Sequence, residues 1–195
     1  VLIENSSSNV FYYGADLSYV NEMEDCGAVY KDSNKNIKDP YKIFAEEGTN
    51  LVRIRLWHNP TWTNYSNIND VKKSIQRAKS EGMKVLLDFH YSDTWADPSK
   101  QEIPSAWLGQ INNNEGLGDL LYNYTYDTLN TLANSGLLPD IVQIGNEING
   151  MILQKGELKW PIDWTRNSLL LNKGIKAVRD INSLKNKQIE IMLHI

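Results

Sequence analysis

Ile141-Val142-Gln143-Ile144-Gly145-Asn146-Glu147 is a short, β-branched apolar run that ends in polar side chains, and it decides the fold. A run of this length and composition is typical of a buried strand. Longer amphipathic segments separate it from similar runs elsewhere in the chain. Those runs are residues 10–16, 51–57, 84–90 and 189–195. The chain is therefore predicted to alternate strands with helices.

The segments between the strands repeat apolar residues at helical spacing and carry helix start and stop signals. Asp39-Pro40 is a good N-cap and first-turn pair, and Gly48 ends that helix. The other predicted helices cover residues 69–81, 117–134 and 164–181. Parallel strands need such crossover connections, so this alternation predicts an α/β protein with a parallel sheet.

Two features favour a (β/α)8 TIM barrel over an open doubly wound sheet. No glycine-rich phosphate loop follows the first strand, where the sequence reads Gly14-Ala15-Asp16-Leu17-Ser18. Each strand also ends in polar or aromatic residues, and barrel active sites are built at those C-terminal ends. Eight repeats at the observed spacing need more than 195 residues. We therefore expect a polar lead-in over residues 1–9 and, over residues 10–195, only the N-terminal portion of the barrel, about strands 1–5.

Composition excludes some classes of partner. The formal net charge is −4, so no overall positive field is present to attract nucleic acid or an anionic membrane. No apolar run is long enough for a membrane span. Six Trp and ten Tyr stand against three Phe, and such amphipathic rings suit stacking on sugars. The single cysteine, Cys26, excludes an internal disulfide and is predicted to be buried.

The end of the fourth strand carries the sharpest chemical signal. Glu147 is placed to donate a proton to a glycosidic oxygen and later to activate water. Asn146 is placed to hydrogen-bond a sugar 2-hydroxyl, a contact that strengthens in the transition state. The alternative is a strand end whose Glu caps the following helix. The position at a barrel strand end favours catalysis.

Strands two and three bring further polar residues to the same end. Arg53, Arg55 and Trp57 share one face by period-two alternation. An Arg there either orients a catalytic carboxylate or belongs to an ion pair in a barrel layer. Asp88 and His90 share a face of strand three. His90 is either a core histidine or a site residue, and Trp57 either packs or contacts a sugar.

The loop after strand three is long, polar and aromatic. Trp95 and Trp107 are the main candidates for sugar-stacking platforms, with Trp62 behind them, although each could simply pack. Asp93 from this loop and Asp16 at the end of strand one are candidate substrate contacts.

His58, His90 and His194 lack zinc-site spacing, and a Gly-x-Ser-x-Gly elbow does not occur, so neither a metal nor a serine nucleophile is expected.

Four longer motifs contain these residues, and through them the chain resembles glycoside hydrolase family 53, the endo-β-1,4-galactanases. The motifs are GADLSYV (14–20), NLVRIRLWHNP (50–60), LLDFHYSDTWADPSKQ (86–101) and PDIVQIGNEINGMIL (139–153). The closing IMLHI (191–195) looks like the fifth strand of that family. The resemblance runs from about Tyr12 to the end of the chain.

The resemblance implies a (β/α)8 barrel of a large clan of retaining enzymes. Glu147 matches the acid/base at the end of strand four, Asn146 its amide partner, and Arg53 the arginine that supports the nucleophile. His90 and Trp95 fall in the substrate-contacting loop region. The nucleophile of that clan is a Glu at the end of strand seven, which we expect beyond Ile195. Glu190, at the start of a strand, is a poor substitute.

The implied activity is endo-acting, retaining cleavage of β-1,4-galactosidic bonds in galactan or arabinogalactan I, the side chains of pectin. No cofactor is expected, the protein is expected to be a secreted or cell-surface monomer, and its partner is the polysaccharide. Two alternatives remain open. One is a carbohydrate-binding pseudo-enzyme, and the other is a retaining hydrolase of another β-glycan such as mannan.

Overall fold

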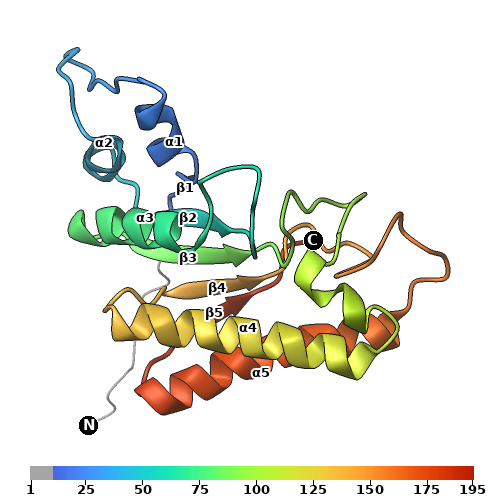
Figure 1. The fold of residues 1–195 in the computed structure, drawn as a ribbon. Coiled ribbons are helices and arrows are strands. Elements are labelled where there is room, and N and C mark those ends of the chain that lie inside the picture. The colour runs from blue at the N-terminus through green and yellow to red at the C-terminus, as the bar shows by residue number, and fades with distance from the viewer. Residues whose placement is uncertain (1–10) are drawn as a thin grey trace, which may run out of the picture.

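The computed structural model describes residues 11–195, so the predicted lead-in over residues 1–9 lies outside the described residues. Within the described range, five parallel strands form one sheet in chain order (Figure 1). The strands are β1 (Gly14–Asp16), β2 (Leu51–Leu56), β3 (Lys84–Phe89), β4 (Ile141–Ile144) and β5 (Glu190–Met192). Each strand is hydrogen-bonded to the next one along the chain, as the predicted crossovers require.

The helices follow the sequence signals closely. They are α1 (Val20–Asp25), α2 (Pro40–Glu46), α3 (Ile68–Ser80), the 3-10 helix η1 (Ser105–Gln110), α4 (Asn114–Asn134) and α5 (Trp164–Lys185). Asp39 caps α2 as predicted, because its side chain accepts a hydrogen bond from the Tyr41 N–H. Helix α4 begins earlier than predicted because the Asn113 side chain caps it. Helix α5 continues to a left-handed Asn186.

The main core lies between the outer face of the sheet and helices α3, α4 and α5. Alternate strand residues point outward and are fully enclosed, among them Val52, Val85 and Val142 at 0% exposure. Figure 1 shows α4 and α5 running side by side along the sheet, with α3 beside β2 and β3. Leu121 from α4 and Val178 from α5 are equally buried in this core. Burial on this scale is the main stabilisation of the sheet.

The inner face of the sheet changes from apolar to polar along the strands. Leu51, Leu86 and Ile141 form a small apolar cluster near the strand starts. Two residues further on lie Arg53, Asp88 and Gln143, pointing to the same side because side chains alternate along a strand. A hollow of about 440 Å³ opens on this face. The sheet thus carries its polar groups toward the C-terminal ends of its strands.

Two expectations need correction. Strand β4 ends at Ile144, because Gly145 adopts a left-handed φ of 83° that stops the extended backbone. Asn146 and Glu147 therefore lie on the loop that follows the strand.

Cys26 is exposed, not buried, because it caps the end of the short helix α1. Among residues 11–195, no helix combines the length and apolar composition needed to cross a bilayer.

Candidate active site

Arg53 on β2 is the centre of the polar network at the strand ends. Its Nη1 donates to Asp16 Oδ2 at 2.5 Å, and its Nη2 donates to Asp88 Oδ2 at 2.6 Å and to Asn146 Oδ1 at 2.7 Å. Burial disfavours the charged form of Asp16, yet hydrogen bonds from Ser18 and the Arg53 guanidinium outweigh it and hold the pKa of Asp16 below its ordinary value. One guanidinium therefore joins β1, β3 and the loop after β4.

Asp88 is completely enclosed, so its carboxylate depends on its neighbours for compensation. Besides Arg53, it accepts from Gln143 Nε2 at 2.6 Å and contacts His90 Nε2 at 2.9 Å. His90 Nδ1 accepts the Ala96 N–H at 3.3 Å, which assigns the proton to Nε2 and makes that nitrogen the donor to Asp88. The polar atoms of Asp88 and His90 are thus occupied by protein partners: Asp88 holds Arg53, and His90 holds Asp88.

Asn146 is fixed on several sides. Its Oδ1 accepts from Arg53 and lies 2.8 Å from His194 Nδ1, while its Nδ2 donates to the Ala96 carbonyl at 2.8 Å. An amide nitrogen carries two hydrogens, and within residues 11–195 only one of those on Asn146 has a partner. The second N–H is available to a ligand.

Glu147 follows directly and differs from its neighbours in both backbone and surroundings. Its φ is 50°, a left-handed conformation that a residue with a side chain seldom adopts. The residue is partly exposed, whereas Asn146 and Ile148 are buried. No hydrogen bond reaches its carboxyl group from any of residues 11–195. A partly exposed carboxyl group on a fixed backbone, next to a free amide N–H, is suited to proton transfer to a bound molecule.

The tryptophans divide into buried and exposed groups. Trp57 is 2% exposed and Trp107 is 4% exposed, so neither has a free ring face, and the prediction that they stack on sugars is not supported. Trp95 at 40% and Trp62 at 58% do present ring surface. The guanidinium of Arg55 lies 4.3 Å from the Trp57 ring and 4.1 Å from the Trp95 ring. Arg55 thus packs against the rings of both Trp57 and Trp95.

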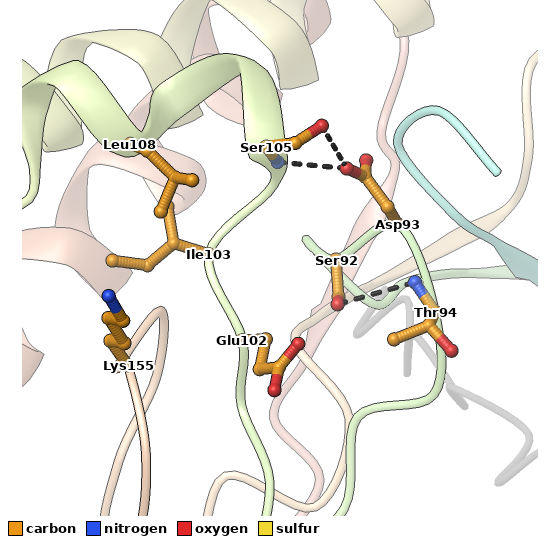
Figure 2. Close-up of a pocket in the computed structure, with 8 residues that line it drawn as sticks. All are labelled: Ser92, Asp93, Thr94, Glu102, Ile103, Ser105, Leu108 and Lys155. Carbon is orange, nitrogen blue, oxygen red and sulfur yellow. Dashed lines mark hydrogen bonds between the residues drawn. The ribbon is translucent and has the colours of Figure 1, made fainter. Parts of the chain in front are cut away.

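Asp93 connects the loop after β2 to the start of η1, and both of its carboxylate oxygens are occupied by these contacts. Its Oδ1 accepts the Asn59 N–H at 3.1 Å and contacts His58 Nδ1 at 3.2 Å. Its Oδ2 accepts from the Ser105 backbone at 2.8 Å and hydroxyl at 2.7 Å (Figure 2). Burial disfavours ionisation of Asp93, but these bonds outweigh it and lower its pKa. Asp93 and Ser105 line a pocket of about 260 Å³, with Lys155 on its far side.

His58 is the titratable partner of Asp93. Burial lowers the pKa of His58 below its ordinary value, although Asp93 acts in the opposite direction. The unfolded chain then binds a proton near pH 6.5 that the folded chain does not bind. Protonation therefore favours the unfolded state, so His58 makes unfolding easier as the pH falls below about 6.5.

We predict that His58→Gln removes this dependence. Glutamine keeps an N–H donor for Asp93 but does not titrate, so the free energy of unfolding should fall less between pH 7 and pH 5 than in the parent protein. Aspartates such as Asp16 and Asp93, with lowered pKa values, titrate below this window. Urea unfolding at several pH values measures the difference. Identical slopes for the two proteins would rule out a depressed pKa at His58.

Two glutamines in this site were not predicted from the sequence. Gln143 on β4 links Arg53 to Asp88. Its Oε1 accepts from Arg53 Nε at 3.3 Å, and its Nε2 donates to Asp88 Oδ1. The sequence does distinguish Gln143, because it is the one polar residue inside the apolar run 141–144. Gln101 is 2% exposed and lies in the loop after β3. Nothing in its local sequence distinguishes it from an exposed loop residue.

No group of three or more His, Cys, Asp or Glu side chains able to hold a metal ion occurs within the described residues. At the ends of the parallel strands the site combines the Arg53 guanidinium, the amides of Asn146, Gln143 and Gln101, and the carboxyl groups of Asp16, Asp88 and Glu147. Such a set performs proton transfer and hydrogen bonding, which are the requirements of carboxyl-based hydrolysis.

Comparison with known proteins identifies the family. Residues 12–195 match the model of glycosyl hydrolase family 53. An arabinogalactan endo-beta-1,4-galactanase of Cellvibrio japonicus (strain Ueda107) is 54% identical over 187 residues, which are 95% of this chain and 49% of that protein. An endo-beta-1,4-galactanase of Bacillus subtilis (strain 168) is 39% identical over 180 residues, covering 89% of this chain and 40% of its own length.

Solved structures give the same result. One from a study of two fungal beta-1,4-galactanases has a TM-score of 0.85 at 40% identity, over 95% of this chain and 54% of its own. The GH53 catalytic domain of Ignisphaera aggregans has a TM-score of 0.81 at 36% identity, over 93% of this chain and 50% of its own. The chain spans about half the length of the relatives that it matches.

Fold and site together define a (β/α)8-barrel protein of the glycoside hydrolase type, represented here by five consecutive strands. Within that class the chain belongs to glycosyl hydrolase family 53. The expected fold and the resemblance to this family are both confirmed.

Proposed function

We propose that this chain supplies the acid/base half of an endo-acting, retaining galactanase that cleaves β-1,4-galactosidic bonds in galactan. The observation that carries the proposal is the placement of Glu147. It follows β4 at the C-terminal end of the sheet, beside an Asn146 that is fixed to Arg53. The names of the matching relatives support galactan as the substrate.

In the first step, Glu147 protonates the glycosidic oxygen as the bond to the anomeric carbon breaks, and a second carboxylate bonds to that carbon to form the glycosyl-enzyme. The remaining N–H of Asn146 donates to the sugar 2-hydroxyl, and this contact strengthens as positive charge develops on the ring. In the second step, the Glu147 carboxylate removes a proton from the water that attacks the glycosyl-enzyme. One carboxyl group therefore serves as acid and then as base.

The nucleophile is proposed to lie outside these residues. Retention needs a second carboxyl group about 5–5.5 Å from the first. The two carboxylates at Arg53 are unsuitable, because Asp88 is fully enclosed and Asp16 is bound by Arg53 and Ser18. Relatives of about twice this length offer the additional strands. Arg53 is then proposed to orient that nucleophile from the hollow on the inner face of the sheet.

Product analysis on purified polysaccharides tests the proposal. The galactanase that contains this chain should release short β-1,4-linked galacto-oligosaccharides from galactan and little from mannan or xylan. Preferential cleavage of mannan would reassign the substrate while leaving the chemistry intact. Sugar binding with no detectable turnover would identify a carbohydrate-binding pseudo-enzyme. The secreted or cell-surface location and the monomeric state remain predictions.

Trp95 is proposed to stack on a sugar ring. It is the exposed ring that adjoins Trp57 and Arg55 at the strand ends. Trp95→Ala should raise KM on galactan about tenfold, equivalent to about 1.4 kcal/mol of binding, with a smaller change in kcat. Trp164→Ala, which removes an exposed Trp from the start of α5, is the matched control. Equal KM values for both variants would remove Trp95 from the binding surface.

A further inference from the structure

Gln101 is a buried loop residue whose side chain contacts the backbone around Glu147. Its Nε2 donates to the Asn146 carbonyl at 2.7 Å, to the Asp97 carbonyl at 3.0 Å and to the Glu147 carbonyl at 3.3 Å. All three partners are acceptors, so the amide must present its nitrogen to them. The two N–H groups of Gln101 are therefore shared among three carbonyl oxygens. The carbonyls of Asn146 and Glu147 lie on either side of the Glu147 Cα.

The two flanking carbonyls determine the backbone conformation of Glu147. They belong to the peptide planes before and after its Cα, and φ and ψ of Glu147 describe how those planes are turned relative to each other. A single amide in contact with both oxygens restricts that rotation. The second peptide is also held from the other side, because the Ile148 N–H donates to the His194 carbonyl at 2.9 Å.

This restraint is needed because Glu147 has a φ of 50°. A side chain disfavours that conformation, so it persists only where surrounding contacts impose it. Within residues 11–195, no hydrogen bond holds the carboxyl group of Glu147 itself. The direction of its Cα–Cβ bond, and with it the region that the carboxyl group reaches, is consequently set by the backbone.

We propose that Gln101 is a positioning residue for the acid/base, which aims the Glu147 carboxyl group by clamping the two carbonyls on either side of it. The proposal rests on the function assigned above. Gln101 itself touches neither substrate nor reacting atoms. The clamp also reaches Asp97 in its own loop, so the loop after β3 and the loop after β4 are held as one unit.

The test uses Gln101→Met in the galactanase that contains this chain, since Met has a similar length but no N–H donor. Gln154→Met is the matched control, because the Gln154 side chain also donates to a backbone carbonyl, that of Glu157. Misplacement of a catalytic group by about 1 Å lowers rates by about 10²-fold. We expect kcat/KM on galactan to fall by about that factor for Gln101→Met alone.

A substrate with an activated leaving group separates positioning from general damage. 2,4-Dinitrophenolate departs without protonation, so kcat/KM for 2,4-dinitrophenyl β-galactobioside should change by less than about threefold in Gln101→Met. Equal losses on both substrates, or no loss on galactan, would overturn the proposal. An inactive parent protein would instead refute the proposed function.

A second variant keeps the test informative if Gln101→Met folds poorly. In Gln101→Glu, a protonated carboxyl group retains one donor for the clamp, whereas an ionised one repels the carbonyl oxygens. Its activity on galactan relative to the parent should therefore decline as the pH rises through the titration of that carboxyl group. A constant ratio across pH would contradict the clamp, as would a crystal structure of either variant with the Glu147 backbone unchanged.

Discussion

Glu147→Gln is expected to slow hydrolysis of β-1,4-galactan by about 10²–10⁴-fold or more, because the amide preserves shape but has no acidic proton to donate. The substitution leaves the backbone contacts with Gln101 in place, since these involve carbonyl oxygens and not the side chain. Release of reducing ends from galactan measures the effect in the galactanase that contains this chain.

The matched control for this variant is Glu157→Gln. Glu157 is an exposed residue of the loop between β4 and α5, and its substitution makes the same chemical change away from Asn146. Full activity is expected for the control. A loss of less than about tenfold for Glu147→Gln would remove Glu147 from the acid/base role, because poor leaving groups depend strongly on proton donation.

Arg53→Met should produce the largest loss of stability. The substitution leaves Asp88, which is fully enclosed, without its guanidinium partner. Removing one member of a buried ion pair typically costs about 3–5 kcal/mol, because only the neutral donors Gln143 and His90 then remain beside the Asp88 carboxylate. We expect the free energy of unfolding, measured in urea, to fall by that amount. Activity on galactan should be lost as well, since Asn146 loses the same partner.

Two further variants identify the cause of this loss. Arg53→Lys keeps the positive charge but not the forked geometry that reaches three side chains, so its stability should be intermediate. Arg53→Met combined with Asp88→Asn removes both charges and should recover part of the lost stability. A loss below about 1 kcal/mol for Arg53→Met, or no recovery in the double variant, would contradict a buried charge as the reason.

The network around Arg53 explains why these substitutions should act together. Asp16, Arg53, Asp88 and Asn146 come from β1, β2, β3 and the loop after β4, and they are joined by direct hydrogen bonds. Gln143 completes the connection on β4. Arg53 donates to Asp16 on β1, Asp88 on β3 and Asn146 on the loop after β4, so one side chain links all three segments. The candidate catalytic loop is therefore fixed to the sheet.

Periodic features of the sequence were sufficient to predict most of the fold. Alternation along β3 placed Asp88 and His90 on one face, and their side chains are in contact, because side-chain direction follows directly from strand geometry. The cap at Asp39 and the stop at Gly48 were also correct, since both signals act within a few residues. The parallel order followed from the length of the connections.

Features that depend on contacts distant in sequence could not be predicted in this way. Asp93 is a candidate substrate contact from the sequence, yet its oxygens accept hydrogen bonds from Asn59, in the loop after β2, and from Ser105, at the start of η1. Trp57 and Trp107 were expected to stack on sugars, yet tertiary packing encloses both. The role of Gln101 depends on carbonyls that lie 45 and 46 residues further along the chain. Patterns among neighbouring residues do not predict contacts between such distant positions.

The acid/base role of Glu147 is tested most directly by introducing Glu147→Ala into the galactanase that contains this chain and reacting it with 2,4-dinitrophenyl β-galactobioside in the presence of azide. Without its base, the variant should accumulate the glycosyl-enzyme, and azide should release it from the face that water normally attacks. We expect faster turnover with azide and a galactobiosyl azide of β configuration. An α-configured azide would make Glu147 the nucleophile, and the absence of any rescue would contradict its role as acid/base.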